Sequence, residues 1–130
     1  MRGISAFDRF GGFARVRLLV ADFYERVLES EQLVGYFDGI DIRRLIDHQT
    51  KFVAAMMGGP ASFTNEQMLR AHQRLGVTDT DFDEMASLFR DTLEDFALDP
   101  DEVTRLHAHL LSMREFVVAT GALPLHGARP

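Results

Sequence analysis

The stretch LIDHQTKFVAAMMGGP, residues 45–60, predicts a helix with one apolar face that ends at a glycine pair. Its apolar residues recur at spacings of three and four and share their face with one amide: Leu45, Gln49, Phe52, Val53 and Met56. Burying an amide without a hydrogen-bond partner costs about 1–3 kcal/mol. We therefore expect that another side chain, or a ligand, hydrogen-bonds to Gln49.

The rest of the chain has the same helical periodicity, and alternation with a period of two is nowhere sustained. Asp41, Thr78 and Asp99 are suited to cap helix N-termini, and Pro100 follows the last of them at the first helical position. We predict an all-α protein with four substantial helices and two or three short ones. The predicted helices cover about residues 5–10, 16–27, 42–57, 64–75, 78–96 and 99–121, with an apolar turn at 33–37 and a loosely held tail at 122–130.

Composition restricts the classes of function. A chain of 130 residues is expected to fold as one domain, residues 1–130. It has no cysteine, which excludes disulfides, thiolate metal sites and thioether-linked cofactors. A net charge of −6 without any basic stripe argues against nucleic acid or an anionic membrane as a partner. No apolar run approaches the ~20 residues of a membrane span, and no signal-peptide pattern is present, so a soluble, cytoplasmic protein is expected.

Three polar side chains lie on faces that are otherwise apolar. Tyr24 and Gln49 could simply hydrogen-bond to each other inside a core, which is the commoner arrangement for such pairs. His72 follows Met68 by four residues and precedes Leu75 by three, so it lies on the inward face of a short helix. A lone histidine there is usually a core residue bonded to a carbonyl, but it is also the type of residue that binds haem iron. The spacing alone leaves both alternatives open.

Six motifs in order make the chain resemble the truncated haemoglobins of group I, the two-on-two globin family. The resemblance runs over about residues 6–118, and no single motif would be specific. The motifs are Gly11 with Gly12, DFYERVL at 22–28, YF at 36–37, HQ at 48–49, GGP at 58–60, and M…AH…LG at 68–76.

The resemblance implies a two-on-two helical sandwich that holds haem b without a covalent bond. His72 matches the proximal iron ligand, and Tyr24 and Gln49 match the distal residues that hydrogen-bond to bound O₂. Ala119 stands where some members have a histidine that attaches the haem. Further haem-contact positions are Phe23, Phe37, which matches the residue stacked on the ring, Leu45, Phe52, Val53, Met68, Val77, Phe82 and Leu110.

The function implied is reversible binding of O₂, and of NO or CO, at an iron held by His72. Two donors at ~1–1.5 kcal/mol each would slow O₂ release roughly tenfold to a hundredfold. The oxygenated protein could also convert NO to nitrate, an NO dioxygenase activity that needs a reductase for turnover.

Two rival functions stay open. His48 either lies at the cavity rim or binds the iron as a sixth ligand, which would suit electron transfer or redox sensing. The other rival is an all-α regulatory module without a cofactor. His107 and His109 are expected on the surface. Asp79, Asp81, Asp83 and Glu84 are expected to form a solvated helix start and not a metal site.

Overall fold

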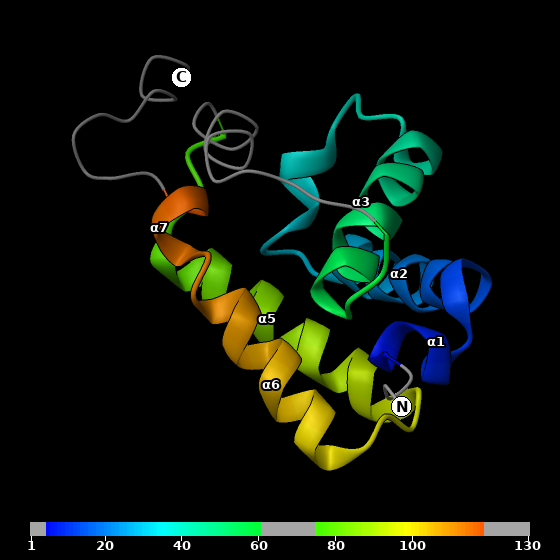
Figure 1. The fold of residues 1–130 in the computed structure, drawn as a ribbon. Coiled ribbons are helices and arrows are strands. Elements are labelled where there is room, and N and C mark those ends of the chain that lie inside the picture. The colour runs from blue at the N-terminus through cyan, green and yellow to red at the C-terminus, as the bar shows by residue number, and fades with distance from the viewer. Residues whose placement is uncertain (1–4, 61–74, 119–130) are drawn as a thin grey trace.

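Two pairs of helices form the body of the protein in the computed structural model, which describes residues 5–60 and 75–118 (Figure 1). Within these residues every regular element is helical, so the prediction of an all-α fold is confirmed. The elements are α1 (Ala6–Phe10), α2 (Gly12–Glu29), the 3₁₀ helix η1 (Val34–Phe37), α3 (Ile42–Met56), α5 (Asp79–Asp95), α6 (Pro100–Leu111) and α7 (Arg114–Val117).

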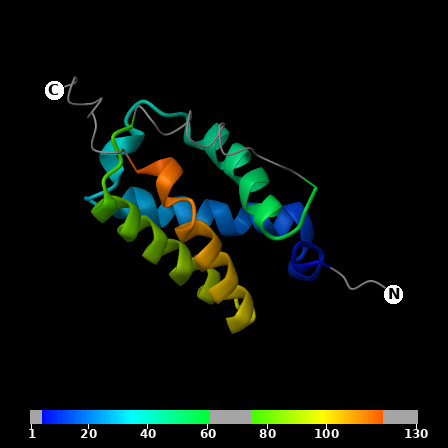
Figure 2. The same cartoon turned by 60° about the vertical axis from the view of Figure 1, so that its left-hand side comes forward.

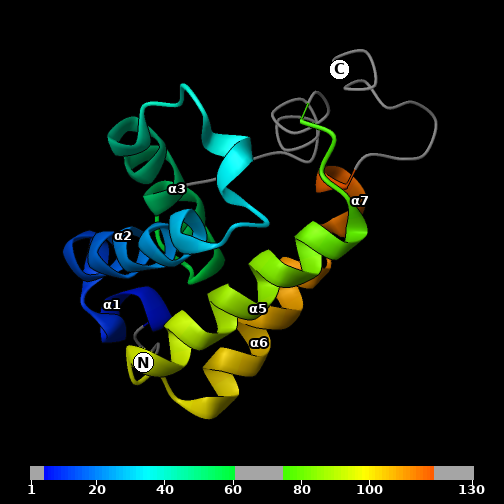
Figure 3. The same cartoon turned by 180° about the vertical axis from the view of Figure 1, so that it is seen from behind.

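The first pair is α2 with α3, and the second is α5 with α6, whose axes run side by side in Figures 2 and 3. Helix α2 also packs on α5 and so joins the two pairs. The core between them is apolar and holds Val16, Leu19, Val20, Phe23 and Val27 of α2, Phe82, Ala86, Phe89 and Leu93 of α5, and Val103, Leu106 and Leu110 of α6. None of the described helices is both long and apolar enough to span a membrane.

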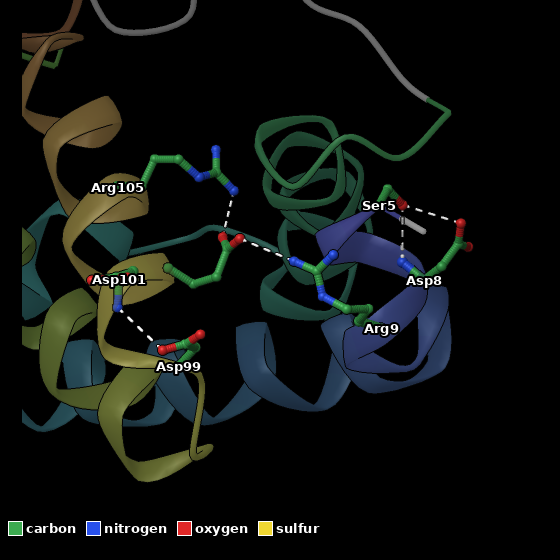
Figure 4. A network of polar contacts seen from close by, with 7 residues as sticks. Ser5, Asp8, Arg9, Asp99, Asp101 and Arg105 are labelled. Atoms are coloured by element: carbon green, nitrogen blue, oxygen red, sulfur yellow. Dashed lines mark hydrogen bonds and ion pairs between the residues drawn. The ribbon is translucent and has the colours of Figure 1, made fainter. Parts of the chain in front are cut away.

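The predicted caps begin the long helices. The side chains of Asp41 and Thr78 accept hydrogen bonds from the backbone N–H groups three residues on, at 3.2 and 3.1 Å. Figure 4 shows the third cap, where Asp99 accepts from the N–H of Asp101 at 3.4 Å. The same view shows α1 tied to α6 by Arg9, which lies 3.3 Å from the Glu102 carboxylate.

The glycine pair after α3 allows a close contact with α1. The backbone N–H of Phe7 donates to the carbonyl of Met57 at 2.9 Å, which brings the Phe7 ring against Gly59. A Cβ on Gly59 would lie 2.8 Å from that ring, closer than side-chain carbons approach. Gly58 has φ +90°, a left-handed conformation that suits glycine. The pair Gly58-Gly59 therefore ends α3 and allows α1 to pack closely against the end of that helix.

The last predicted helix is not continuous, and that part of the prediction is wrong. Helix α6 ends at Leu111, and α7 begins at Arg114. At the break the Ser112 hydroxyl donates to the carbonyl of His109 at 2.6 Å, and the N–H of Met113 bonds three residues back to Leu110 at 2.9 Å. Such local bonds replace the α-helical pattern and turn the chain. Val117 is nevertheless buried, as its spacing indicated.

Several predictions concern residues outside the described ranges. They are the helix expected at 64–75, with Met68 and His72, and the chain beyond Val118, with Ala119 and the tail at 122–130.

Candidate functional site

A cavity of about 360 Å³ lies between the two helix pairs, within the usual range for sites that hold a small molecule or cofactor. Helices α2, η1 and α3 form one side of it, and α5, α6 and α7 form the other. Most of its lining is apolar. The lining residues outside the predicted set are Val20, Val27, Leu33, Tyr36, Ile40, Met56, Leu75, Asp81, Met85, Phe89, Met113 and Val117.

Every predicted site residue in the described ranges lines this one cavity, although the residues come from distant parts of the chain. They are Phe23, Tyr24, Phe37, Leu45, His48, Gln49, Phe52, Val53, Val77, Phe82 and Leu110. The structure therefore brings this set together, while the role of each residue stays a prediction.

Aromatic rings hold Tyr24 in place. Its ring packs edge-on against Phe23, with centroids 4.9 Å apart, and against Phe37 at 5.9 Å. Phe23 packs in turn on Phe89 of α5 at 5.5 Å. Edge-to-face pairs at these distances are favourable. The four rings therefore form a continuous row of contacts that runs from η1 through α2 to α5 and fixes the orientation of the Tyr24 ring.

Tyr24 and Gln49 do not hydrogen-bond to each other. Among the described residues, neither the Tyr24 hydroxyl nor the Gln49 amide has a hydrogen-bond partner. Tyr24 keeps some surface on the cavity, yet burial of its hydroxyl raises the pKa of that group above its usual value. It therefore stays protonated, and the cavity wall holds two donors for which a partner is expected.

The histidines occupy different environments. His48 is exposed and lines the cavity beside Gln49, so it lies at the rim. His109 is exposed as expected, but His107 is half-buried, with its Nδ1 3.4 Å from the Arg90 guanidinium. Burial and the Arg90 charge lower the pKa of His107. The expectation of a surface residue was wrong there because α6 packs His107 against α5.

Some lining residues were missed from the sequence. Met85 and Phe89 follow Phe82 by three and seven residues, so helical periodicity could have found them. Asp81 was expected to be solvated with its acidic neighbours, but it accepts a hydrogen bond from the Tyr36 hydroxyl of η1. Nothing in the local sequence signals this bond, because the two residues meet only in the folded protein.

Arg114 of α7 packs against the side of the cavity that α5, α6 and α7 form. Its guanidinium lies 4.6 Å from the centroid of the buried Phe82 ring, a cation–π distance. The same guanidinium bonds to Asp79 at 2.9 Å and to Asp83 at 2.6 Å. These contacts join α7 to the start of α5 behind the cavity.

Known proteins are similar to this chain in sequence and in architecture. The model of the bacterial-like globin family matches residues 5–119. The group 1 truncated hemoglobin GlbN of Mycolicibacterium paratuberculosis is 40% identical over 89 residues, which are 68% of this chain and 65% of that protein. The match thus spans less than two thirds of that relative's length. GlbN of Synechocystis is 28% identical over 106 residues, covering 78% of this chain and 86% of that protein.

Among solved structures, the 2/2 hemoglobin of Synechococcus, in the cyanomet state and with covalently attached heme, superposes with a TM-score of 0.81. Its sequence identity to this chain is 30%, and the alignment covers 88% of this chain and 98% of that structure. Two paired helices on each side of a cavity, together with these matches, are the two-on-two arrangement that the motifs indicated. The chain therefore belongs to the bacterial-like globin family and has the fold of its group 1 truncated haemoglobins.

Proposed function

We propose that this protein binds haem b in the cavity without a covalent bond and uses it to bind O₂, and also NO or CO, reversibly. The observation that carries the proposal is a pair of donors in a mostly apolar pocket, Tyr24 and Gln49, which have no hydrogen-bond partner among the residues that the structure describes. Membership of the globin family implies haem binding. In the proposal His72 holds the iron.

The residues present suit such a cofactor. Phe37, Phe52 and Phe82 supply flat apolar contacts for a porphyrin, while exposed His48 lies at the rim. Haem supplies an iron at which diatomic gases bind. The chain supplies what surrounds the gas: an apolar wall that limits access of water, and two donors, Tyr24 and Gln49, for a ligand that carries partial negative charge.

Titration of the apoprotein with haemin tests the proposal. We expect saturation at one haem per chain, and a ferrous spectrum that changes on adding O₂ and returns when O₂ is removed. Acidified organic solvent should extract all the haem, because Ala119 offers no imidazole for a covalent bond. Uptake without saturation, or rapid oxidation by O₂ with no oxygenated form, would contradict the proposal.

The finer proposal is an NO dioxygenase activity. Reaction of the oxygenated protein with NO would place both atoms of O₂ in nitrate and leave the iron oxidised by one electron. A reductase would have to return that electron before a second cycle. Mixing oxygenated protein with NO should give one nitrate per haem; loss of the oxygenated spectrum without nitrate would exclude this activity.

The second candidate function rests on the position of His48 in the cavity lining. If His48 and His72 both bound the iron, the protein would suit electron transfer or redox sensing better than gas storage. A six-coordinate, low-spin ferrous spectrum before any gas is added would favour this function. A five-coordinate spectrum would favour reversible gas binding.

A further inference from the structure

The carboxylate of Asp81 joins the two sides of the cavity. Asp81 lies in the first turn of α5, and one carboxylate oxygen accepts a hydrogen bond from the Gln32 side chain at 2.7 Å. The other oxygen accepts from the Tyr36 hydroxyl of η1. Gln32 also donates to the carbonyl of Thr80 at 3.2 Å. Figure 2 shows η1 beside the start of α5, where these bonds form.

The surroundings of Asp81 favour its charged form. Burial opposes ionisation, but hydrogen bonds from Tyr36, Gln32 and Thr78 outweigh it and hold the pKa of Asp81 below its usual range. A carboxylate in the first turn of a helix is also favoured by the helix dipole. Burial, and then the bond to Asp81, raise the pKa of Tyr36 to about 12, so Tyr36 remains a donor. The bond is thus charge-assisted at neutral pH.

The bonds from Tyr36 and Gln32 to Asp81 matter because packing holds η1 only in part: Tyr36 and Phe37 pack against the core but are only half-buried. None of the four residues of η1 is fully buried. Tyr36 and Phe37 nevertheless both line the cavity, and Phe37 packs against the Tyr24 ring at 5.9 Å. The position of Phe37 therefore depends on the hydrogen bonds made by its neighbour, and the orientation of Tyr24 depends partly on Phe37.

We propose that Asp81 is a positioning residue of the cofactor cavity: by holding Tyr36 and Gln32 it fixes η1, keeps Phe37 in the wall and slows loss of the haem. This inference rests on the proposed haem binding. Although Asp81 lines the cavity, its role in this proposal is exerted through η1 and not through contact with cofactor or gas.

Haem transfer to excess apomyoglobin measures the effect. Asp81→Asn keeps the shape but removes the charge and replaces one acceptor oxygen by an NH₂ group, so Gln32 and Tyr36 can no longer each donate to an oxygen of their own. We expect haem loss to be roughly three- to tenfold faster, the range for losing a charge-assisted hydrogen bond that is partly open to solvent. Tyr36→Phe should have a similar effect, and the double variant should be little worse than either alone.

Asp79→Asn is the matched control, because Asp79 lies in the same first turn but bonds to Arg114. It makes the same charge change and should leave haem loss within about twofold of wild type. Equal effects of Asp79→Asn and Asp81→Asn, or additive effects of Asp81→Asn and Tyr36→Phe, would overturn the inference.

A second readout needs no haem. In the apoprotein, Tyr36 should ionise at a lower pH in Asp81→Asn than in wild type, because Asp81 is the charged group that raises its pKa. An unchanged tyrosinate titration would show that Tyr36 does not hydrogen-bond to the Asp81 carboxylate, and would overturn the inference. A chain that takes up no haem would refute the proposed function and this inference together, whereas tight haem binding with equal loss rates refutes only the inference.

Discussion

At the scale of single residues, the proposed function depends on two donors in a mostly apolar wall, the Tyr24 hydroxyl and the Gln49 amide. Neither has a hydrogen-bond partner among the described residues, which would cost free energy unless a ligand accepts from them. Burial keeps Tyr24 protonated by raising its pKa. In the proposed function, the two residues therefore donate hydrogen bonds to a gas ligand that carries partial negative charge.

Tyr24→Phe tests this role of the hydroxyl. The variant keeps the ring contacts with Phe23 and Phe37 and removes one donor. We expect O₂ to dissociate about tenfold faster, which corresponds to ~1–1.5 kcal/mol for one hydrogen bond. Rapid mixing with a ligand that replaces O₂ gives the rate. CO is the control, because it carries less charge when bound and should respond less; equal changes for both gases would argue against a hydrogen bond.

At the scale of elements, the C-terminal cap of α5 has an alanine, Ala97, at a position where its backbone conformation favours glycine. The N–H of Leu98 bonds to the carbonyl of Leu93 at 3.4 Å, and that of Ala97 to Glu94 at 3.0 Å, which is the Schellman pattern. Glycine usually occupies the left-handed position of this motif, but here Ala97 does so with φ +58°. The cap thus contains a local backbone strain.

Ala97→Gly should remove that strain. We expect the free energy of unfolding to rise by about 1 kcal/mol, because glycine adopts a left-handed φ without steric cost. Ala108→Gly, at an exposed position inside α6, is the matched control and should lower it by about 1 kcal/mol. Urea unfolding of both variants measures the two changes. Destabilisation by Ala97→Gly similar to that of Ala108→Gly would disprove the strain at Ala97.

The starts of α3, α5 and α6 could be predicted from the sequence, whereas the start of α2, the break between α6 and α7, and the contacts between elements could not. Asp41, Thr78 and Asp99 cap helices through their own side chains, a property of a few adjacent residues. The break at Ser112 depends on which of several local hydrogen bonds wins in the folded protein. The tie between Asp81 and Tyr36 joins residues 45 apart in sequence, so no local pattern reveals it.

At the scale of the whole molecule, the apolar stripes indicated which faces would pack, but not how far apart the helix pairs stand. The volume of the cavity depends on how α2, α3 and α5 pack against one another, so it cannot be predicted from the apolar stripe of any one helix. The location of a common site was predicted instead from the motifs that resemble the family, because in that family the residues matching Tyr24, Gln49 and His72 belong to one site. The first two do line a common cavity.

Tyrosine titration reports on the side of the cavity formed by α2 and η1, because Tyr24 and Tyr36, one in each of these elements, are the two tyrosines of the sequence. Burial raises both pKa values, that of Tyr36 to about 12. The unfolded chain therefore loses these protons first, near pH 10. The free energy of unfolding should stay level with respect to these groups below about pH 10 and then fall as pH rises through the folded pKa values.

Ultraviolet absorbance of tyrosinate, followed beside urea unfolding, checks this expectation. The folded protein should show little tyrosinate at about pH 10.5, while the unfolded chain should be largely ionised there. Tyr36→Phe should leave only the signal of Tyr24. A folded protein in which both tyrosines ionise with a midpoint near pH 10 would contradict the buried positions.

The most direct test of the central claim is the absorption spectrum of the haem-loaded, reduced protein, compared between wild type, His72→Ala and His48→Ala. If His72 holds the iron, His72→Ala should lose haem readily and lack the wild-type spectrum. His48→Ala should retain haem and give a five-coordinate ferrous form that binds O₂ reversibly. Unchanged haem affinity and an unchanged spectrum in His72→Ala would contradict the account.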